Sequence, residues 1–142
     1  GQLVLFHFWK PKFYRPMQEF VDNNLRPLFA SSSYLELLII SVMAGLGEEL
    51  LFRWCIQGGI TTLAVPQLGV TGGIGTAVVI ASLLFGACHW VNNIYLLMAS
   101  LVGGYLGLAM VMTGNWLVPA FAHAAFDFIA LLYIVSSKSA PT

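Results

Sequence analysis

The chain has 142 residues, of which 58% are apolar and only 8% are charged, and its six basic and six acidic side chains cancel. This composition is far more apolar than the average for a soluble globular domain, so lipid is needed to cover the excess apolar surface. The charge balance, with no broad basic face and no acidic tract, argues against nucleic acid as a partner and against a disordered acidic tail.

The first 33 residues combine aromatic rings with lysines, arginines and prolines, a mixture typical of chain that lies in the lipid headgroup layer. We interpret residues 1–33 as a juxtamembrane, interfacial segment, and His7 within it receives no role. The chain starts at Gly1, without a charged leader or a signal-peptide cleavage site ahead of its first apolar residues. We therefore expect this segment to be the remnant of a longer part with further N-terminal spans.

A capping box marks the first long helix. The sequence Ser33-Tyr34-Leu35-Glu36 has the Ser-x-x-Glu form and stands at the start of an apolar stretch that runs to about Gly58-Gly59. At about 1.5 Å per residue this stretch is long enough to cross a bilayer core. One proline and three glycines between residues 66 and 73 then predict a break in the chain.

Three further apolar segments follow, at about residues 74–90, 94–112 and 116–135. The predicted fold is therefore all-α: a polytopic transmembrane bundle of about four spanning helices over residues 34–135. Gly103, Gly104 and Gly107 in the third segment predict close helix packing. Cys55 and Cys88 lack any paired spacing and are interpreted as packing residues.

The basic residues predict the orientation. Four of the six lie before the first long helix, and Lys138 lies in the tail at residues 136–142. By the positive-inside tendency both termini are expected in the cytoplasm, which requires an even number of spans. The expected location is a bacterial inner membrane.

Six ionisable side chains fall within the predicted spans: Glu48, Glu49, Arg53, His89, His123 and Asp127. Each charged group costs about 2.5 to 3.5 kcal/mol at the bilayer centre even on a lenient scale, so the set is expensive unless its members are partnered. One or two serines or asparagines would hold helices together at lower cost. The set is therefore our candidate active site.

The spacing within each helix predicts which groups meet. Glu49 and Arg53 are four residues apart with the acid first, which is the favourable order for an ion pair. Glu48 points about 100° away from that pair and is a candidate general base. His123 and Asp127 repeat the four-residue spacing, so the carboxylate can hold the imidazole in one tautomer.

Three motifs, in this order on successive helices, resemble those of the CAAX protease and bacteriocin-processing family of intramembrane endopeptidases, which includes the Ras-converting enzymes. They are E-E-x-x-x-R at residues 48–53, F-x-x-x-H at residues 85–89 and H-x-x-x-N/D at residues 123–127. Each motif alone is a weak signal, whereas the ordered trio at membrane depth is specific. The resemblance spans about residues 34–135.

The resemblance implies a role for each candidate residue. Glu48 would activate a water molecule together with His89, and the predicted ion pair would support the site. His123 and the residue at position 127 would stabilise the oxyanion that forms when water attacks a peptide carbonyl. Ras-converting members carry Asn where this chain has Asp127, and an ionised Asp cannot donate to an oxyanion. This departure favours peptide processing of the broader bacterial kind over prenylated C-a-a-X substrates.

The expected function is thus hydrolysis of a peptide bond in a membrane-associated or prenylated substrate, with membrane lipids as the other partner. No cofactor is favoured, because the sequence lacks an H-E-x-x-H helix and the Glu49 carboxylate has Arg53 as its partner. The alternative is a divalent metal such as zinc, bound by Glu48, His89 and His123.

Two other functions stay open from the residues alone. A catalytically silent membrane scaffold, or a bacteriocin self-immunity protein, would keep the polar cluster for assembly. A proton-coupled carrier would use Glu and His as a relay, but the spans show no inverted repeat and no paired broken helices.

Overall fold

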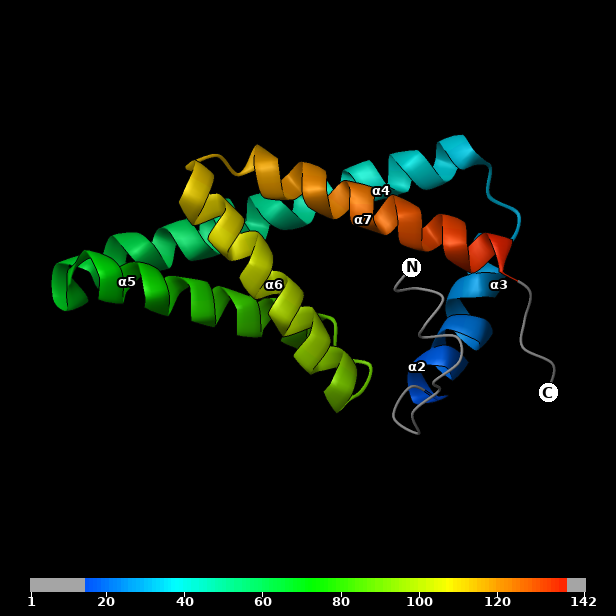
Figure 1. The fold of residues 1–142 in the computed structure, drawn as a ribbon, viewed down its shortest axis with the longest axis horizontal. Helices are drawn as coiled ribbons and strands as arrows, with labels where there is room; N and C mark the ends of the chain where they lie inside the picture. The colour runs from blue at the N-terminus through cyan, green and yellow to red at the C-terminus, as the bar shows by residue number, and fades with distance from the viewer. Residues whose placement is uncertain (1–14, 138–142) are drawn as a thin grey trace.

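The computed structural model describes residues 15–137, and these residues form helices joined by short connections, as the sequence predicted (Figure 1). The N-terminal part consists of α2 (Arg15–Phe20), a π-helical turn (Val21–Leu25) and α3 (Arg26–Phe29). The long elements are α4 (Tyr34–Glu49), the π-helix η2 (Leu50–Gln57), α5 (Gly58–Cys88), α6 (Asn93–Thr113) and α7 (Leu117–Ser136). His7, Lys10, Lys12 and Lys138 lie outside the described residues, as do parts of the predicted segments 1–33 and 136–142.

The predicted start of the first long helix is confirmed. The Ser33 hydroxyl accepts from the backbone N–H of Glu36, and the Glu36 carboxylate accepts from the backbone N–H of Ser33. The predicted end near Gly58-Gly59 is wrong, because helix continues through both glycines to Leu68. In a lipid environment a backbone that left the helix would leave its polar groups unpaired, so two glycines are not enough to end it.

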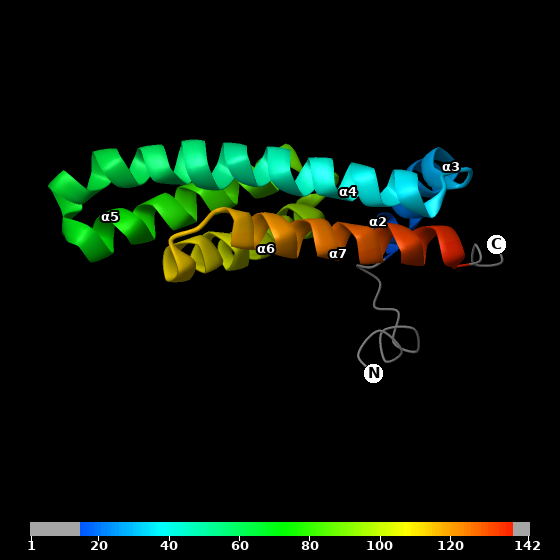
Figure 2. The ribbon, with the colours of Figure 1, turned by 90° about the horizontal axis from the view of Figure 1, so that it is seen from above.

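The chain turns back at Gly69, within the expected break. Gly69 has φ 71° and ψ 171°, a conformation open to glycine and to almost no other residue. The two arms of α5 touch just beyond this turn, since a Cβ on Gly73 would lie 2.6 Å from the backbone of Val65. Figure 2 shows the resulting hairpin at one end of the bundle.

Three helical segments are long and apolar enough to cross a membrane: Tyr34–Cys88, Asn93–Thr113 and Leu117–Ser136. We expected four separate spans. The first two form one continuous segment of 55 residues that is folded back on itself at Gly69. The protein is an integral membrane protein in which α4, α5 and α7 run roughly along the long axis and α6 crosses them obliquely (Figure 1).

The buried side chains of the bundle are mostly polar or small, and the exposed ones are mostly apolar, as expected of a protein surrounded by lipid. Leu35, Met43 and Leu63 are among the many large apolar side chains that are exposed. The buried set contains only a few large apolar residues, and it includes Glu49 and Arg53, both fully buried. The interior therefore depends on polar pairing rather than on a large hydrocarbon core.

Arg26 ties the N-terminal helices to the end of α7. Its guanidinium donates to the carbonyl oxygens of Ile134 and Ser137 and pairs with Asp22 at 3.0 Å. A cation at a helix C-terminus satisfies carbonyls that have no helical partner. The start of α4 and the end of α7 consequently lie at the same end of the bundle (Figure 1).

Glycines allow α6 to approach its neighbours closely, as the sequence predicted. A Cβ on Gly103 would lie 3.2 Å from Phe85, and one on Gly107 would lie 2.9 Å from Oε1 of Gln57. Across the same interface, a Cβ on Gly86 would lie 2.7 Å from the Leu96 carbonyl oxygen. Helices α5 and α6 therefore pack backbone against backbone beside the candidate site.

We predict that Gly45→Ala destabilises the protein whereas Gly47→Ala does not. A Cβ on Gly45 would lie 2.7 Å from the carbonyl oxygen of Ala120 and 2.8 Å from Ala124, so α4 and α7 would have to separate. Such overpacking costs about 1 to 3 kcal/mol. A Cβ on Gly47 meets nothing within 4 Å, and alanine favours helix by up to about 1 kcal/mol. Thermal unfolding in detergent checks this pair, and equal melting temperatures would contradict it.

Candidate active site

The first part of the site is a fully buried ion pair between neighbouring turns. Nε of Arg53 donates to Oε2 of Glu49 at 2.6 Å, and both side chains are 0% exposed. The predicted pairing within four residues is therefore confirmed. The other carboxylate oxygen of Glu49 lies 3.0 Å from Nδ1 of His123, which comes from α7. Glu49 thus connects the first long helix to the last.

His123 lies between two carboxylates. Its Nδ1 faces Glu49, and its Nε2 lies 3.5 Å from Oδ2 of Asp127, one turn further along α7. A neutral imidazole has one N–H and one lone pair, so both carboxylates are satisfied together only if an additional proton is present on the ring or on a carboxyl group.

His89 is held by the end of its own helix. It is the C-cap of α5, and its Nδ1 lies 2.8 Å from the carbonyl oxygen of Phe85, an acceptor, so Nδ1 carries the hydrogen. This contact directs Nε2 toward Glu48, whose Oε2 is 3.3 Å away. The Glu48 carboxylate, and to a smaller extent the Phe85 carbonyl, raise the pKa of His89 above its ordinary value of 6.5, against the opposing effect of burial.

Phe85 joins the two histidines. Its ring stacks on the His89 imidazole with centroids 4.4 Å apart and meets His123 edge to face at 5.7 Å. The guanidinium carbon of Arg53 lies over the same ring, 5.4 Å from its centroid. The Phe52 ring packs against the Phe85 ring in a T-shaped arrangement, with the two centroids 5.0 Å apart. The sequence indicated only that Phe85 and His89 belong to one F-x-x-x-H motif.

The structure brings all six candidate residues into one region at the junction of α4, η2, α5 and α7. The region has an inner and an outer part. Glu49, Arg53 and His123 are 7% exposed or less, whereas the side chains of Glu48, His89 and Asp127 are 33, 28 and 31% exposed. Only the outer part is accessible to a water molecule or a substrate.

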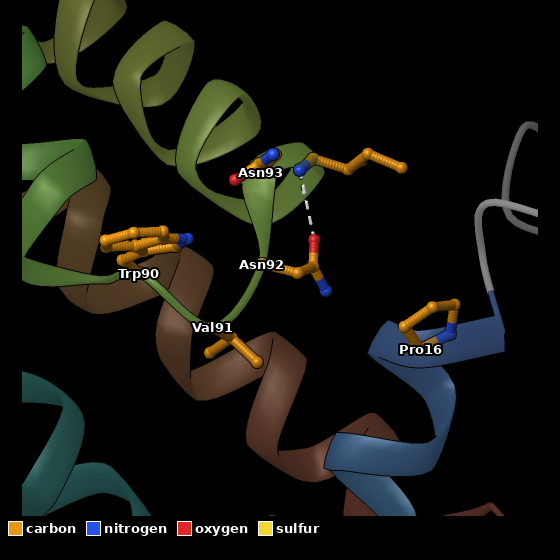
Figure 3. Close-up of a pocket in the computed structure, with 6 residues that line it drawn as sticks. Pro16, Trp90, Val91, Asn92 and Asn93 are labelled. Atoms are coloured by element: carbon orange, nitrogen blue, oxygen red, sulfur yellow. Dashed lines mark hydrogen bonds between the residues drawn. The ribbon is translucent and has the colours of Figure 1, made fainter.

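A shallow pocket of about 480 Å³ lies next to this region along the chain. It is lined by Pro16 of α2 and by residues 90–94, which follow His89 directly (Figure 3). Asn92, one of the lining residues, is the N-cap of α6, and its side-chain oxygen accepts from the backbone N–H groups of Ile94 and Tyr95. The second apolar segment, predicted to end at about residue 90, ends there in the structure as well, since α5 ends at Cys88 and α6 begins at Asn93.

Two residues of this region were not singled out from the sequence. Phe52 is 4% exposed and packs on Phe85, and Gln57 is 3% exposed and donates to the carbonyl oxygen of Gly107. Gln57 continues the four-residue series of Glu49 and Arg53, so its position on the same helix face was a signal that could have identified it.

The alternative zinc ligands do not gather around one point. Glu48 faces His89, while His123 faces Glu49 and Asp127, and among residues 15–137 no three His, Cys, Asp or Glu side chains are grouped so as to hold a metal ion. Metal-free chemistry stays a prediction.

One comparison with known proteins returned a match. A family model described as "Type II CAAX prenyl endopeptidase Rce1-like" matches residues 30–129. No curated protein and no solved structure matches the chain. The matched range contains all six candidate residues and every motif on which the resemblance rested.

Proposed function

The chain belongs to the Rce1-like family of type II CAAX prenyl endopeptidases, and on this premise we propose that it hydrolyses a peptide bond of a membrane-associated substrate with water activated by Glu48. The observation that carries the proposal is the contrast between two adjacent glutamates. Glu49 is buried and bonded to Arg53 and His123, whereas the side chain of Glu48 is one-third exposed and faces Nε2 of His89 at 3.3 Å.

The proposed reaction begins with a water molecule beside Glu48. The carboxylate accepts a proton while the water oxygen attacks the peptide carbonyl carbon, and the carbonyl π electrons move onto oxygen. The carbon–nitrogen bond then breaks, and the proton moves from Glu48 to the leaving amine. The products are a carboxylic acid and an amine, which together contain all the atoms of the peptide and the water, so no oxidant or reductant is needed.

The neighbouring groups have distinct proposed roles. His89, held by Phe85 at Nδ1, keeps Nε2 directed at Glu48 and so fixes the position of the base. His123, as a donor, and Asp127, in its protonated form, would stabilise the oxyanion. Glu49 and Arg53 are both 0% exposed, so they are out of reach of the substrate and would act as positioning residues.

The test is cleavage by the purified chain in lipid bilayers. Peptides tethered to the membrane by a prenyl group, by a transmembrane helix or by neither anchor are incubated with the protein, and the products are identified by mass spectrometry. We expect cleavage of an anchored peptide, with one oxygen from isotopically labelled water in the new carboxylate. Absence of cleavage across the panel would overturn the proposal, and a parallel reaction with a strong chelator tests the metal-free mechanism.

A further inference from the structure

Gln57 is a buried polar residue to which the proposed mechanism gives no role. It ends η2, is 3% exposed, and donates from Nε2 to the carbonyl oxygen of Gly107 at 3.1 Å. Its Oε1 is fully buried and has no hydrogen-bond partner among the described residues. Buried side-chain oxygens are normally partnered, so this one requires an explanation.

Arg53 has the complementary deficiency. Its Nε is bonded to Glu49, but Nη1 and Nη2 are buried without a partner in the described part of the chain. Nη1 can only donate and the amide oxygen of Gln57 can only accept. The two atoms also lie near each other, because the position that a Cβ on Gly107 would occupy is 3.4 Å from Nη1 of Arg53 and 2.9 Å from Oε1 of Gln57.

We infer that Gln57 is a positioning residue whose Oε1 is linked to Nη1 of Arg53 through one buried water molecule, which accepts from the guanidinium and donates to the amide oxygen. This link fixes the Nη1 side of the Arg53 guanidinium, whose Nε already donates to Glu49. Glu49 in turn orients His123, so the chain of contacts extends from α6 to His123 in the inner part of the site. It also accounts for glycine at position 107, where a side chain would displace Gln57.

A purely structural role makes a different prediction. If Gln57 served only to join η2 to α6 through Nε2, its loss would lower the melting temperature and leave the Arg53 guanidinium unchanged. The distinguishing readout is therefore the ¹⁵N NMR spectrum of the Arg53 side chain in lipid nanodiscs, assigned by its loss in Arg53→Met. This readout does not depend on the proposed function.

The variants compared are Gln57→Met, which has no amide, and Gln57→Glu, which keeps an acceptor oxygen. In the parent we expect slowly exchanging Nη–H signals, because a hydrogen-bonded guanidinium rotates and exchanges slowly. These signals should be lost in Gln57→Met and retained in Gln57→Glu. Unchanged Arg53 signals in Gln57→Met would overturn the inference.

A cleavage assay provides the second readout, and this arm rests on the proposed function. We expect Gln57→Met to lower kcat about 10- to 100-fold with KM unchanged, and Gln57→Glu to recover part of the loss. Gly107→Ala should reproduce the loss. The matched control Gly104→Ala, whose Cβ would meet only Oγ of Ser82 at 3.7 Å, should not.

The two proposals fail separately. If no anchored peptide is cleaved by the parent while Gln57→Met loses the Arg53 signals, the peptidase function is wrong and the positioning role of Gln57 stands. If cleavage occurs but Gln57→Met keeps both kcat and the Arg53 signals, the positioning role is wrong and the peptidase function stands.

Discussion

Glu48→Gln should reduce the rate of peptide cleavage by about 10²- to 10⁴-fold, the usual contribution of general-base catalysis. The amide has nearly the same shape as the carboxylate but cannot take a proton from water at neutral pH. Since the Glu48 side chain is one-third exposed and the amide oxygen of glutamine can take the place of Oε2 beside Nε2 of His89, the fold should tolerate the change. Single-turnover cleavage of an anchored peptide measures the rate, and thermal unfolding checks the fold.

A matched control exists on the same helix. Glu36 is exposed and belongs to the capping box of α4, where glutamine is an equally acceptable residue. Glu36→Gln should therefore cleave at the parental rate. Glutamate-driven hydrolysis would be refuted by a Glu48→Gln protein that folds normally and also cleaves at the parental rate.

Arg53→Met should cost about 3 to 5 kcal/mol of stability, the largest loss that we expect from one substitution. The change removes the partner of a carboxylate that is 0% exposed, and an unpaired buried charge is far more costly than an unpaired surface charge. Asp22→Asn is the matched control. It breaks an ion pair of the same spacing, at 3.0 Å, between side chains that are 18 and 24% exposed, and should cost about 0 to 1 kcal/mol.

The double variant Glu49→Leu/Arg53→Met separates stability from function. Replacing both charges of a buried pair by apolar groups is often neutral, so this protein should recover most of the lost stability. It should nevertheless cleave slowly, because His123 loses the Glu49 oxygen that orients it at 3.0 Å. Denaturant unfolding in detergent, paired with the cleavage assay, measures both effects. A double variant as unstable as Arg53→Met would show that the ion pair is not the source of the loss.

Local patterns in the sequence predicted the features that depend on only a few neighbouring residues. The capping box, the Glu49–Arg53 pair and the His123–Asp127 contact all join groups three or four residues apart, and helix geometry alone brings such groups together. The apolar composition of each segment likewise predicted the membrane helices, since apolar surface of this extent must be covered by lipid. The predicted end of the first helix was wrong because glycine permits a bend without requiring one. The chain bends at Gly69 rather than near Gly58-Gly59.

Contacts between helices were decided by the tertiary structure. Glu48 meets His89 and Glu49 meets His123 only because α4 approaches α7 at Gly45 and α5 turns back at Gly69. No residue pattern predicted that Leu50–Gln57 forms a π-helix. Periodicity determines which side chains share a face of one helix, whereas helix rotation and crossing, which depend on close packing at glycines far apart in the chain, determine which faces meet.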